Sequence, residues 1–325
     1  MTRTQSESGF SLIELIIAMG VLLTVSSIVT TALLQMTNAQ TTIWNRTEMH
    51  SGIRGATELL QQEVGQAGRI TLPGTVTLGT AVVAAAACDP GTPALNAVTV
   101  GVTSIAGMFA SAGPPPAYIM LSTLDGDNIE SFKVAALLTS PPRITACFTK
   151  AHPAGTVLVP MGGFATGIIP DTGMANGSTA TKLKLYGDIN GDGNMVYVEY
   201  TCDPTTTHNL YRNVMAFDAG SKPAVTDSEI LLSNVIVNPG GTACFTYQTS
   251  SMLVQGTSFT FVLDVAITLT VQTELLDPVT RQYQKETKAL LNVSPRNVFN
   301  AWSLASIGYT DRIQSTPTSV NSLLP

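Results

Sequence analysis

The feature that most constrains this chain is an apolar segment near its N-terminus that contains a single carboxylate. Among the 25 residues from Phe10 to Leu34, only Glu14 is charged. As an α-helix this segment is about 37 Å long, which is enough to cross a hydrocarbon core of about 30 Å. A carboxylate in that core costs on the order of 2.5–3.5 kcal/mol. The sequence therefore predicts a membrane-spanning helix in which Glu14 has a specific role.

The residues around Glu14 form a longer motif. The string Gly9-Phe10-Ser11-Leu12-Ile13-Glu14 follows a short polar N-terminus and precedes more apolar sequence. It resembles the signal of type IV prepilins and pseudopilins. The resemblance implies that residues 1–9 are a leader, that prepilin peptidase cleaves between Gly9 and Phe10, and that Phe10 is then N-methylated. It also implies that the Glu14 carboxylate forms a charge pair with the Phe10 amine of a neighbouring subunit during filament assembly.

Two alternatives remain at this stage. A carboxylate four residues from a cationic terminus can also meet that terminus within one helix, so the pair could form inside one chain. The motif could also be an ordinary signal anchor with a stray Glu14. A cleaved secretory signal has a positive n-region and an apolar core of about 7–15 residues. Here Arg3 is offset by Glu7 and the apolar run is longer, which favours the prepilin interpretation.

A second helical pattern follows the apolar segment. Apolar residues recur at spacings of three and four, which is typical of one buried helical face. Pro73-Gly74 then interrupts the pattern. The sequence predicts one helix from Phe10 to Ile70, with a transmembrane half at 10–34 and an amphipathic half at 35–72. The apolar face consists of Met49, Ile53, Ala56, Leu60, Val64 and Ala67.

Residues 73–325 are expected to form an exported, β-rich domain. The clearest strand is Ser258–Gln272, where every odd position from Phe259 to Val271 is apolar. Gln282–Val293 is expected to return as its hairpin partner. The fold class is therefore α+β, with a long N-terminal helix packed on a large antiparallel domain. Further strands are expected at 97–102, 118–121, 129–138, 143–149, 182–186, 195–201, 209–213, 229–237 and 244–248.

Two regions of this domain have a distinct composition. Glycine and proline are scattered through Pro160–Ser178, which is expected to divide two lobes near 160–178. The tail after Trp302 is rich in Ser and Thr and is expected to be loosely ordered.

The four cysteines all lie in the exported part, where an oxidising compartment favours two disulfides. Four cysteines allow three pairings. Cys88 and Cys202 each precede Asp-Pro, whereas Cys147 and Cys244 each lie in Ala-Cys-Phe-Thr. The repeated context favours Cys88–Cys147 and Cys202–Cys244. Free, buried thiols are the alternative.

One segment has the pattern of a calcium-binding loop. Residues 188–199 fit D-x-[DN]-x-[DN]-G-x5-E, in which alternate oxygens surround a glycine turn. The flanking residues look like strands, so the pleat could turn the last ligand elsewhere. The alternative is a solvated hairpin turn. The predicted cofactor is Ca²⁺, and the candidate ligands are Asp188, Asn190, Asp192, Asn194 and Glu199.

The rest of the sequence indicates a structural protein rather than an enzyme. No nucleophile elbow, phosphate loop or dinucleotide motif is present. His50, His152 and His208 are scattered and are expected at the surface. The formal net charge is −6 and no basic patch occurs, which argues against nucleic acid as a partner.

The resemblance implies a more specific role. The large exported part and the D-x-N-G-D-G element are most similar to PilW-type minor pilins or J-type minor pseudopilins. Such a subunit would initiate or cap a type IV pilus or a type II secretion pseudopilus. Its partners would be prepilin peptidase, other major and minor pilins or pseudopilins, and an inner-membrane assembly platform.

The same resemblance implies a location. The chain would cross the bacterial inner membrane once, with its C-terminal domain outside the cytoplasm, and would then enter the filament. Two other functions compete with this one. The first is a calcium-stabilised tip adhesin or ligand-binding module on a pilin-like stalk, and the second is a membrane-tethered exported enzyme.

Overall fold

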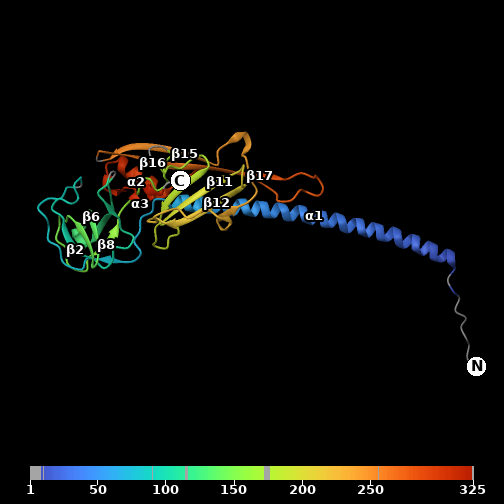
Figure 1. The fold of residues 1–325 in the computed structure, drawn as a ribbon, viewed down its shortest axis with the longest axis horizontal. Coiled ribbons are helices and arrows are strands. Elements are labelled where there is room, and N and C mark those ends of the chain that lie inside the picture. Colours follow the sequence, from blue (N-terminus) through green and yellow to red (C-terminus); the bar gives the residue numbers. More distant parts are fainter. Residues whose placement is uncertain are drawn as a thin grey trace, which may run out of the picture. The chain divides into compact units, whose positions relative to one another are not determined.

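A computed structural model describes residues 9, 11–89, 91–113, 116–171, 176–254 and 256–323 (Figure 1). The chain divides into two compact units. The first combines Met1–Ser51 with Gln272–Lys285, and the second combines Gly52–Val271 with Glu286–Pro325. The first unit holds most of a long helix and one loop, whereas the second holds the β-rich domain.

The helix α1 extends from Leu12 to Gln66. It is long and apolar enough to cross a membrane, and none of its most apolar window is buried. The expected apolar face of its second half is confirmed, because Ile53, Leu60 and Val64 are at most 1% exposed. The helix ends four residues before the expected Ile70. Gly68 adopts φ +78°, a left-handed conformation typical of a residue that follows a helix.

The β-rich unit contains three main sheets. The first has the order β1-β8-β5-β6-β7-β2, the second β10-β11-β12-β13, and the third β14-β16-β15 with β17 paired to β16. The strands of the first sheet are β1 (Val76–Thr77), β2 (Val98–Gly101), β5 (Met120–Leu124), β6 (Ser131–Thr139), β7 (Pro142–Ala146) and β8 (Val157–Pro160). Those of the second are β10 (Lys182–Gly187), β11 (Val196–Asp203), β12 (Asn209–Ala216) and β13 (Ile230–Leu232). Those of the third are β14 (Val235–Ile236), β15 (Phe245–Val254), β16 (Thr257–Gln272) and β17 (Lys285–Val293).

Shorter elements complete this unit. β3 (Ala110–Ser111) pairs with β4 (Ala117–Tyr118), and β9 (Gly163–Phe164) pairs in parallel with β18 (Ile313–Gln314). The helices α2 (Arg296–Ser306) and α3 (Thr318–Ser322) follow β17. The α+β class with a long N-terminal helix and an antiparallel β-rich domain is therefore confirmed, as is the strand expected at 258–272.

The expected lobe boundary coincides with a change of sheet. The first sheet ends at Pro160 and the second begins at Lys182. One hydrophobic core nevertheless includes Phe148 from the first part of the domain and Tyr186 and Tyr197 from the second. Phe164, which lies between the two sheets in sequence, contacts the Tyr186 ring with centroids 4.8 Å apart. Both sheets therefore belong to the same compact unit.

The expectation of a loosely ordered tail is wrong. Val320 and Leu323 are at most 1% exposed and belong to the main core. The buried Gln314 side chain binds backbone groups on two other segments: its Nε2 donates to the carbonyls of Met120 and Met161, at 2.9 and 2.7 Å. A Ser/Thr-rich composition concealed these few anchoring residues, because each is isolated in the sequence.

Candidate functional site

The N-terminal motif lies at the start of α1. Phe10 and residues 1–8 are outside the described residues, whereas Gly9, Ser11 and Glu14 are described and exposed. The Ser11 backbone N–H donates to Glu14 Oε2 at 3.1 Å, and the Ile13 N–H approaches Ser11 Oγ at 3.4 Å. Serine followed three residues later by glutamate is a capping-box pattern, which satisfies N–H groups that a helix start leaves free. Glu14 therefore also caps the helix.

The residues that surround this cap match a known sequence motif. The prokaryotic N-terminal methylation motif matches residues 4–30. The chain carries the type IV prepilin-like signal. No curated protein and no solved structure matches the chain. The match covers residues 4–9 of the expected leader, the expected cleavage position between Gly9 and Phe10, Glu14 and part of the apolar helix.

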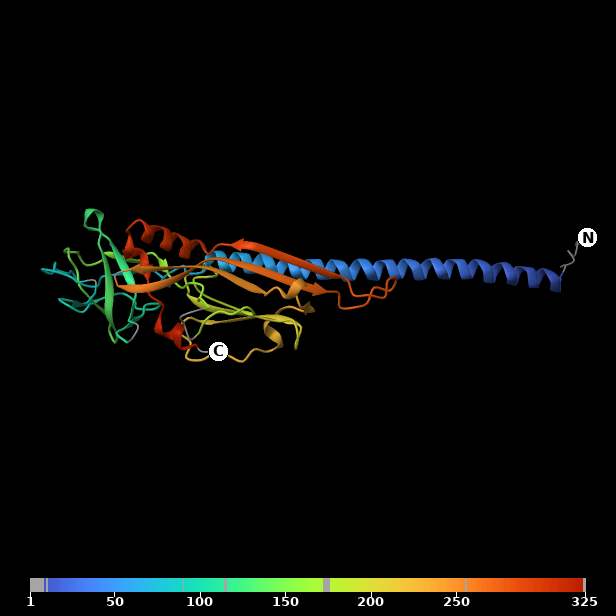
Figure 2. The same cartoon turned by 90° about the horizontal axis from the view of Figure 1, so that it is seen from above.

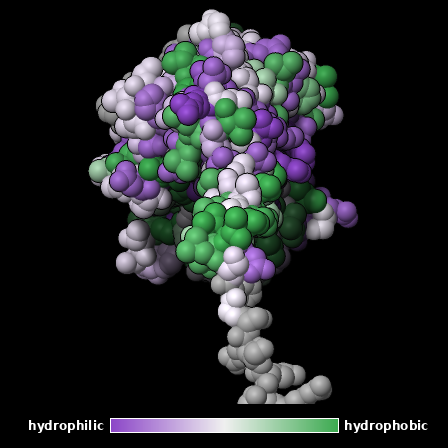
Figure 3. All heavy atoms as spheres, turned by 90° about the vertical axis from the view of Figure 1, so that its right-hand side faces the viewer, coloured by the Kyte–Doolittle hydropathy of each residue, from purple (hydrophilic) through white to green (hydrophobic). Residues whose placement is uncertain are grey.

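The prepilin-like signal has two consequences. It implies processing by prepilin peptidase and assembly with other pilins, so the chain is pilin-like or pseudopilin-like. Together with the long apolar helix it fits a membrane-anchored pilin. Large apolar side chains such as Leu12, Ile16 and Leu23 are more than half exposed along α1. Figure 3 shows hydrophobic residues gathered low on this face of the molecule, and exposed apolar surface of this kind marks an interaction or membrane site.

The candidate calcium loop connects β10 to β11 and packs against the end of α1. The Asp188 N–H donates to the Arg69 carbonyl at 2.9 Å, and the Gly68 N–H donates to the Tyr186 carbonyl at 2.9 Å. Asp188 is 1% exposed, and its Oδ2 lies 3.5 Å from Arg69 Nε. Within the loop, the Asn194 N–H donates to Asp192 Oδ1 at 2.8 Å. The loop therefore holds the end of the helix against the second sheet.

Glu199 lies away from this loop. It pairs with Lys184 in the register of β10 and β11, so the pleat separates it from the loop residues. Its carboxylate contacts Lys222 Nζ at 2.5 Å and Lys182 Nζ at 3.5 Å. Burial lowers the pKa of the neighbouring Lys184 to about 8. Glu199 thus forms ion pairs within a cluster of lysines. The structure therefore does not bring the five expected calcium ligands together.

The remaining loop residues fit a cation only in part. Neither carboxylate oxygen of Asp188 accepts a hydrogen bond from the described residues, which suits a positive ligand. The Arg69 guanidinium already provides a positive charge beside it. Among the described residues, no group of three or more His, Cys, Asp and Glu side chains is arranged for a metal ion. Calcium binding by Asp188, Asn190, Asp192 and Asn194 therefore stays a prediction.

That prediction can be tested by thermal unfolding. If calcium binds the folded protein but not the unfolded chain, a calcium concentration of 100 times the Kd stabilises the folded state by about 2.7 kcal/mol. Millimolar Ca²⁺ is expected to raise the Tm of the wild type and not that of Asp192→Ala. Magnesium at the same concentration is the control for ionic strength. An unchanged wild-type Tm would exclude a calcium site of useful affinity.

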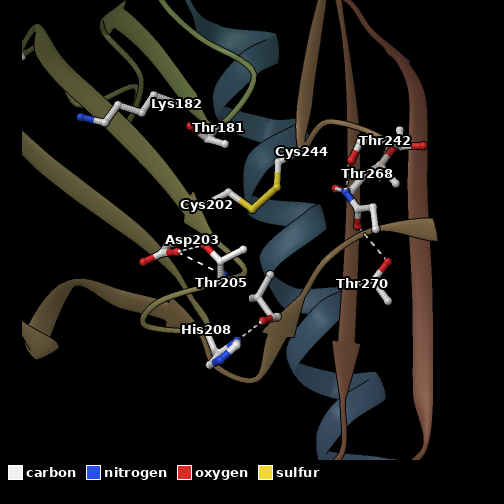
Figure 4. The surroundings of a disulfide bond; sticks show 12 residues. Thr181, Lys182, Cys202, Asp203, Thr205, His208, Thr242, Cys244, Thr268 and Thr270 are labelled. Carbon is white, nitrogen blue, oxygen red and sulfur yellow. Dashed lines mark hydrogen bonds between the residues drawn. A yellow bond between two sulfur atoms is a disulfide. The ribbon is translucent and has the colours of Figure 1, made fainter. Parts of the chain in front are cut away.

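The structure contains the disulfides Cys88–Cys147 and Cys202–Cys244, the pairs favoured by the repeated context. The second bond links β11 to the residue before β15, and thereby the second sheet to the third (Figure 4). Next to it, Asp203 accepts a hydrogen bond from the Thr205 N–H at 3.2 Å in the turn after β11. Closing loops of 59 and 42 residues is worth about 4 kcal/mol each in the chain-entropy description.

The expectation that His152 lies at the surface is wrong. It is 2% exposed, with Nδ1 3.0 Å from Asp125 Oδ2 and Nε2 2.7 Å from Glu130 Oε1. Glu130 also accepts the Thr149 N–H at 2.7 Å. The surface position was expected because Pro153, which follows the histidine, indicated a loop. The two carboxylates are distant from His152 in sequence, and only the fold of the first sheet brings them to the imidazole.

A buried ion pair holds the second half of α1 on the second sheet, and the sequence analysis missed it. Glu63 is 3% exposed, and Arg212 Nε donates to its two oxygens at 3.0 and 3.2 Å. The Tyr200 hydroxyl also donates to Glu63. Burial, together with the Glu63 carboxylate, raises the pKa of Tyr200 well above its usual value, so the hydroxyl keeps its proton. The sequence did contain one sign of this ion pair: Glu63 is a charged residue that lies beside Leu60 and Val64, which belong to the apolar face of the helix.

Proposed function

We propose that this chain is a minor subunit of a type IV pilus or a type II secretion pseudopilus, and that it helps to initiate or cap the filament. One observation carries the proposal: a prepilin-like signal begins a helix whose C-terminal part, from Gly52, belongs to a large, disulfide-linked β-rich unit. A β-rich unit of this size suits a subunit at the end of a filament better than a subunit that repeats along its length. Its role is structural rather than enzymatic.

The mechanism uses the two halves of α1. The apolar half stores the processed subunit in the membrane, where Glu14 is costly. During assembly the subunit leaves the bilayer and joins a helical bundle. There the Glu14 carboxylate meets the Phe10 amine of a neighbour, and the charge pair replaces an unfavourable isolated charge. The inner-membrane platform and the other pilins supply the neighbours.

The copy number of the subunit tests this proposal. A minor role predicts far fewer copies than the major pilin, concentrated at one end of each filament, and fewer filaments when the chain is absent. Quantitative immunoblots of sheared filaments and gold labelling of the β-rich unit measure both quantities. Even labelling along the filament would instead indicate a major subunit.

A tip adhesin is the second candidate, because the β-rich unit has a cavity. This cavity of about 120 Å³ lies beside the Cys88–Cys147 bond and includes the charged residues Asp89, Lys133 and Asp311 in its lining. Burial lowers the pKa of Lys133. If Lys133→Ala abolishes attachment to a surface while filament number is unchanged, the adhesin function is favoured over the purely structural one.

A further inference from the structure

The loop between β16 and β17 lies beside α1 within the first compact unit. Arg46 on the helix donates to Gln284 Oε1 on the loop, and the side chain of Thr42 hydrogen-bonds to Asp277. Figure 2 shows this loop, in orange-red, next to the helix. Both contacts fix the loop at the level of residues 42–46 of α1.

A network around Asp277 gives the loop a defined shape. Its Oδ1 accepts the N–H groups of Val279 and Thr280, each at 2.8 Å, and its Oδ2 accepts from Gln284 Nε2 at 2.7 Å. The Arg281 N–H donates to the Asp277 carbonyl at 2.8 Å. Asp277 itself is 4% exposed, and its carboxylate stabilises the conformation of the loop through these hydrogen bonds.

Four large apolar side chains of this loop are exposed to solvent. Together with two helix residues at the same level, they form what we call the apolar collar. Its members are 45–74% exposed, although each is large and hydrophobic: Ile43, Trp44, Leu275, Leu276, Val279 and Tyr283. The exposed charges of the loop are Glu274, Arg281 and Lys285, which is a small positive excess in a chain of net charge −6.

The uncharged length of α1 indicates what faces the collar. After Glu14 the next charged residue is Arg46, and the 31 residues from Leu15 to Asn45 carry no charge. They extend over about 46 Å, which compares with about 40–45 Å for a bilayer including its headgroups. A helix that crosses the membrane with Glu14 just below one surface therefore places Trp44 in the headgroup region of the other.

We propose that the apolar collar is a membrane-interface anchor, which inserts its side chains among the lipid headgroups around the point where α1 leaves the bilayer. This inference rests on the proposed function, because it needs α1 in the membrane. Trp and Tyr favour this zone, and apolar side chains there reach about 5–10 Å into the headgroup and acyl boundary. Arg281 and Lys285 can extend to lipid phosphates. The collar thus fixes the depth of the stored subunit.

Depth-dependent quenching of tryptophan in the full-length chain tests this proposal. The protein is reconstituted in phosphatidylethanolamine–phosphatidylglycerol vesicles that contain lipids brominated near the headgroup end of the acyl chain. In a Trp44→Phe/Trp302→Phe background, Tyr283→Trp places the one indole on the loop. We expect bromolipid to quench this indole about as strongly as it quenches Trp44 in a Trp302→Phe chain.

Leu253→Trp in the same background is the matched control. Leu253 is 71% exposed, but it lies in β15 opposite Ser258, near the start of β16, so about 46 Å of strand separates its level from the loop that follows Gln272. Its indole is expected to be unquenched. Equal quenching of the two introduced indoles, or none at position 283 while Trp44 is quenched, overturns the anchor and leaves the proposed function intact.

Two further outcomes separate the alternatives. If position 283 is unquenched in vesicles but becomes inaccessible to aqueous iodide on incorporation into filaments, the collar binds a neighbouring subunit and the lipid proposal is wrong. If Trp44 is also unquenched and carbonate extracts the protein from vesicles, α1 is not in the membrane, and the membrane-storage step of the proposed function fails together with the anchor.

Discussion

Replacing Glu14 by glutamine is expected to leave the chain processed and membrane-bound but to reduce its incorporation into filaments at least tenfold. The reason is electrostatic, because glutamine cannot form a charge pair with the Phe10 amine of a neighbour. At 4 Å and an effective dielectric constant of 20 such a pair is worth about 4 kcal/mol. Immunoblots of membrane and sheared-filament fractions, normalised to the major pilin, measure the change.

Glutamine is chosen because Glu14 has two roles. Its Oε2 accepts the Ser11 N–H in the capping box, and glutamine serves that position as well as glutamate does. Glu14→Ala removes both the cap and the charge. If Glu14→Gln behaves as the wild type and Glu14→Ala does not, helix capping is the function of this residue and the charge-pair mechanism is wrong.

A variant at the cleavage position provides the opposite pattern. Gly9→Leu is expected to keep the leader, since the resemblance to prepilins implies that Gly9 lies immediately before the scissile bond. This chain remains in the membrane at its precursor mass and is absent from filaments. Comparison of the two variants separates a failure of processing from a failure of assembly.

Periodic patterns predicted this fold well. The stripe from Ile53 to Ala67 and the alternation along Ser258–Gln272 depend on one element each, and burial of one face follows from spacing alone. The cysteine pairing was suggested by local repeats. Elements with few anchoring residues were missed, among them the tail around Gln314, whose partners Met120 and Met161 are far away in sequence.

The polar sites were predicted less well, for a related reason. The calcium pattern described the turn at Asp188–Asn194. A pattern of residue types cannot show that Glu199 forms ion pairs with Lys182 and Lys222 instead. His152 likewise needs two carboxylates from another part of the sheet. Such partners depend on tertiary contacts between distant segments, whereas the prepilin-like signal is contiguous and could be identified from the sequence.

The buried pair of Glu63 and Arg212 is expected to have the largest effect on stability. Arg212→Ala leaves the buried Glu63 carboxylate alone, which costs about 3–5 kcal/mol. For a domain of this size the Tm is expected to fall by about 6–20 °C. Glu63→Ala leaves Arg212, whose side chain is 25% exposed and can reach solvent, and is expected to cost less. Thermal unfolding of the full-length chain in detergent, followed by circular dichroism, measures the change.

A second ion pair on the same helix provides a matched control. Arg54 and Glu58 are 2.7 Å apart but are 73% and 60% exposed, so solvent screens the pair and Glu58→Ala is expected to leave the Tm nearly unchanged. The double variant Glu63→Met/Arg212→Met removes both charges and is expected to recover much of the loss. If Arg212→Ala is as mild as Glu58→Ala, the pair does not hold α1 on the second sheet, and packing of Ile53, Leu60 and Val64 alone maintains that contact.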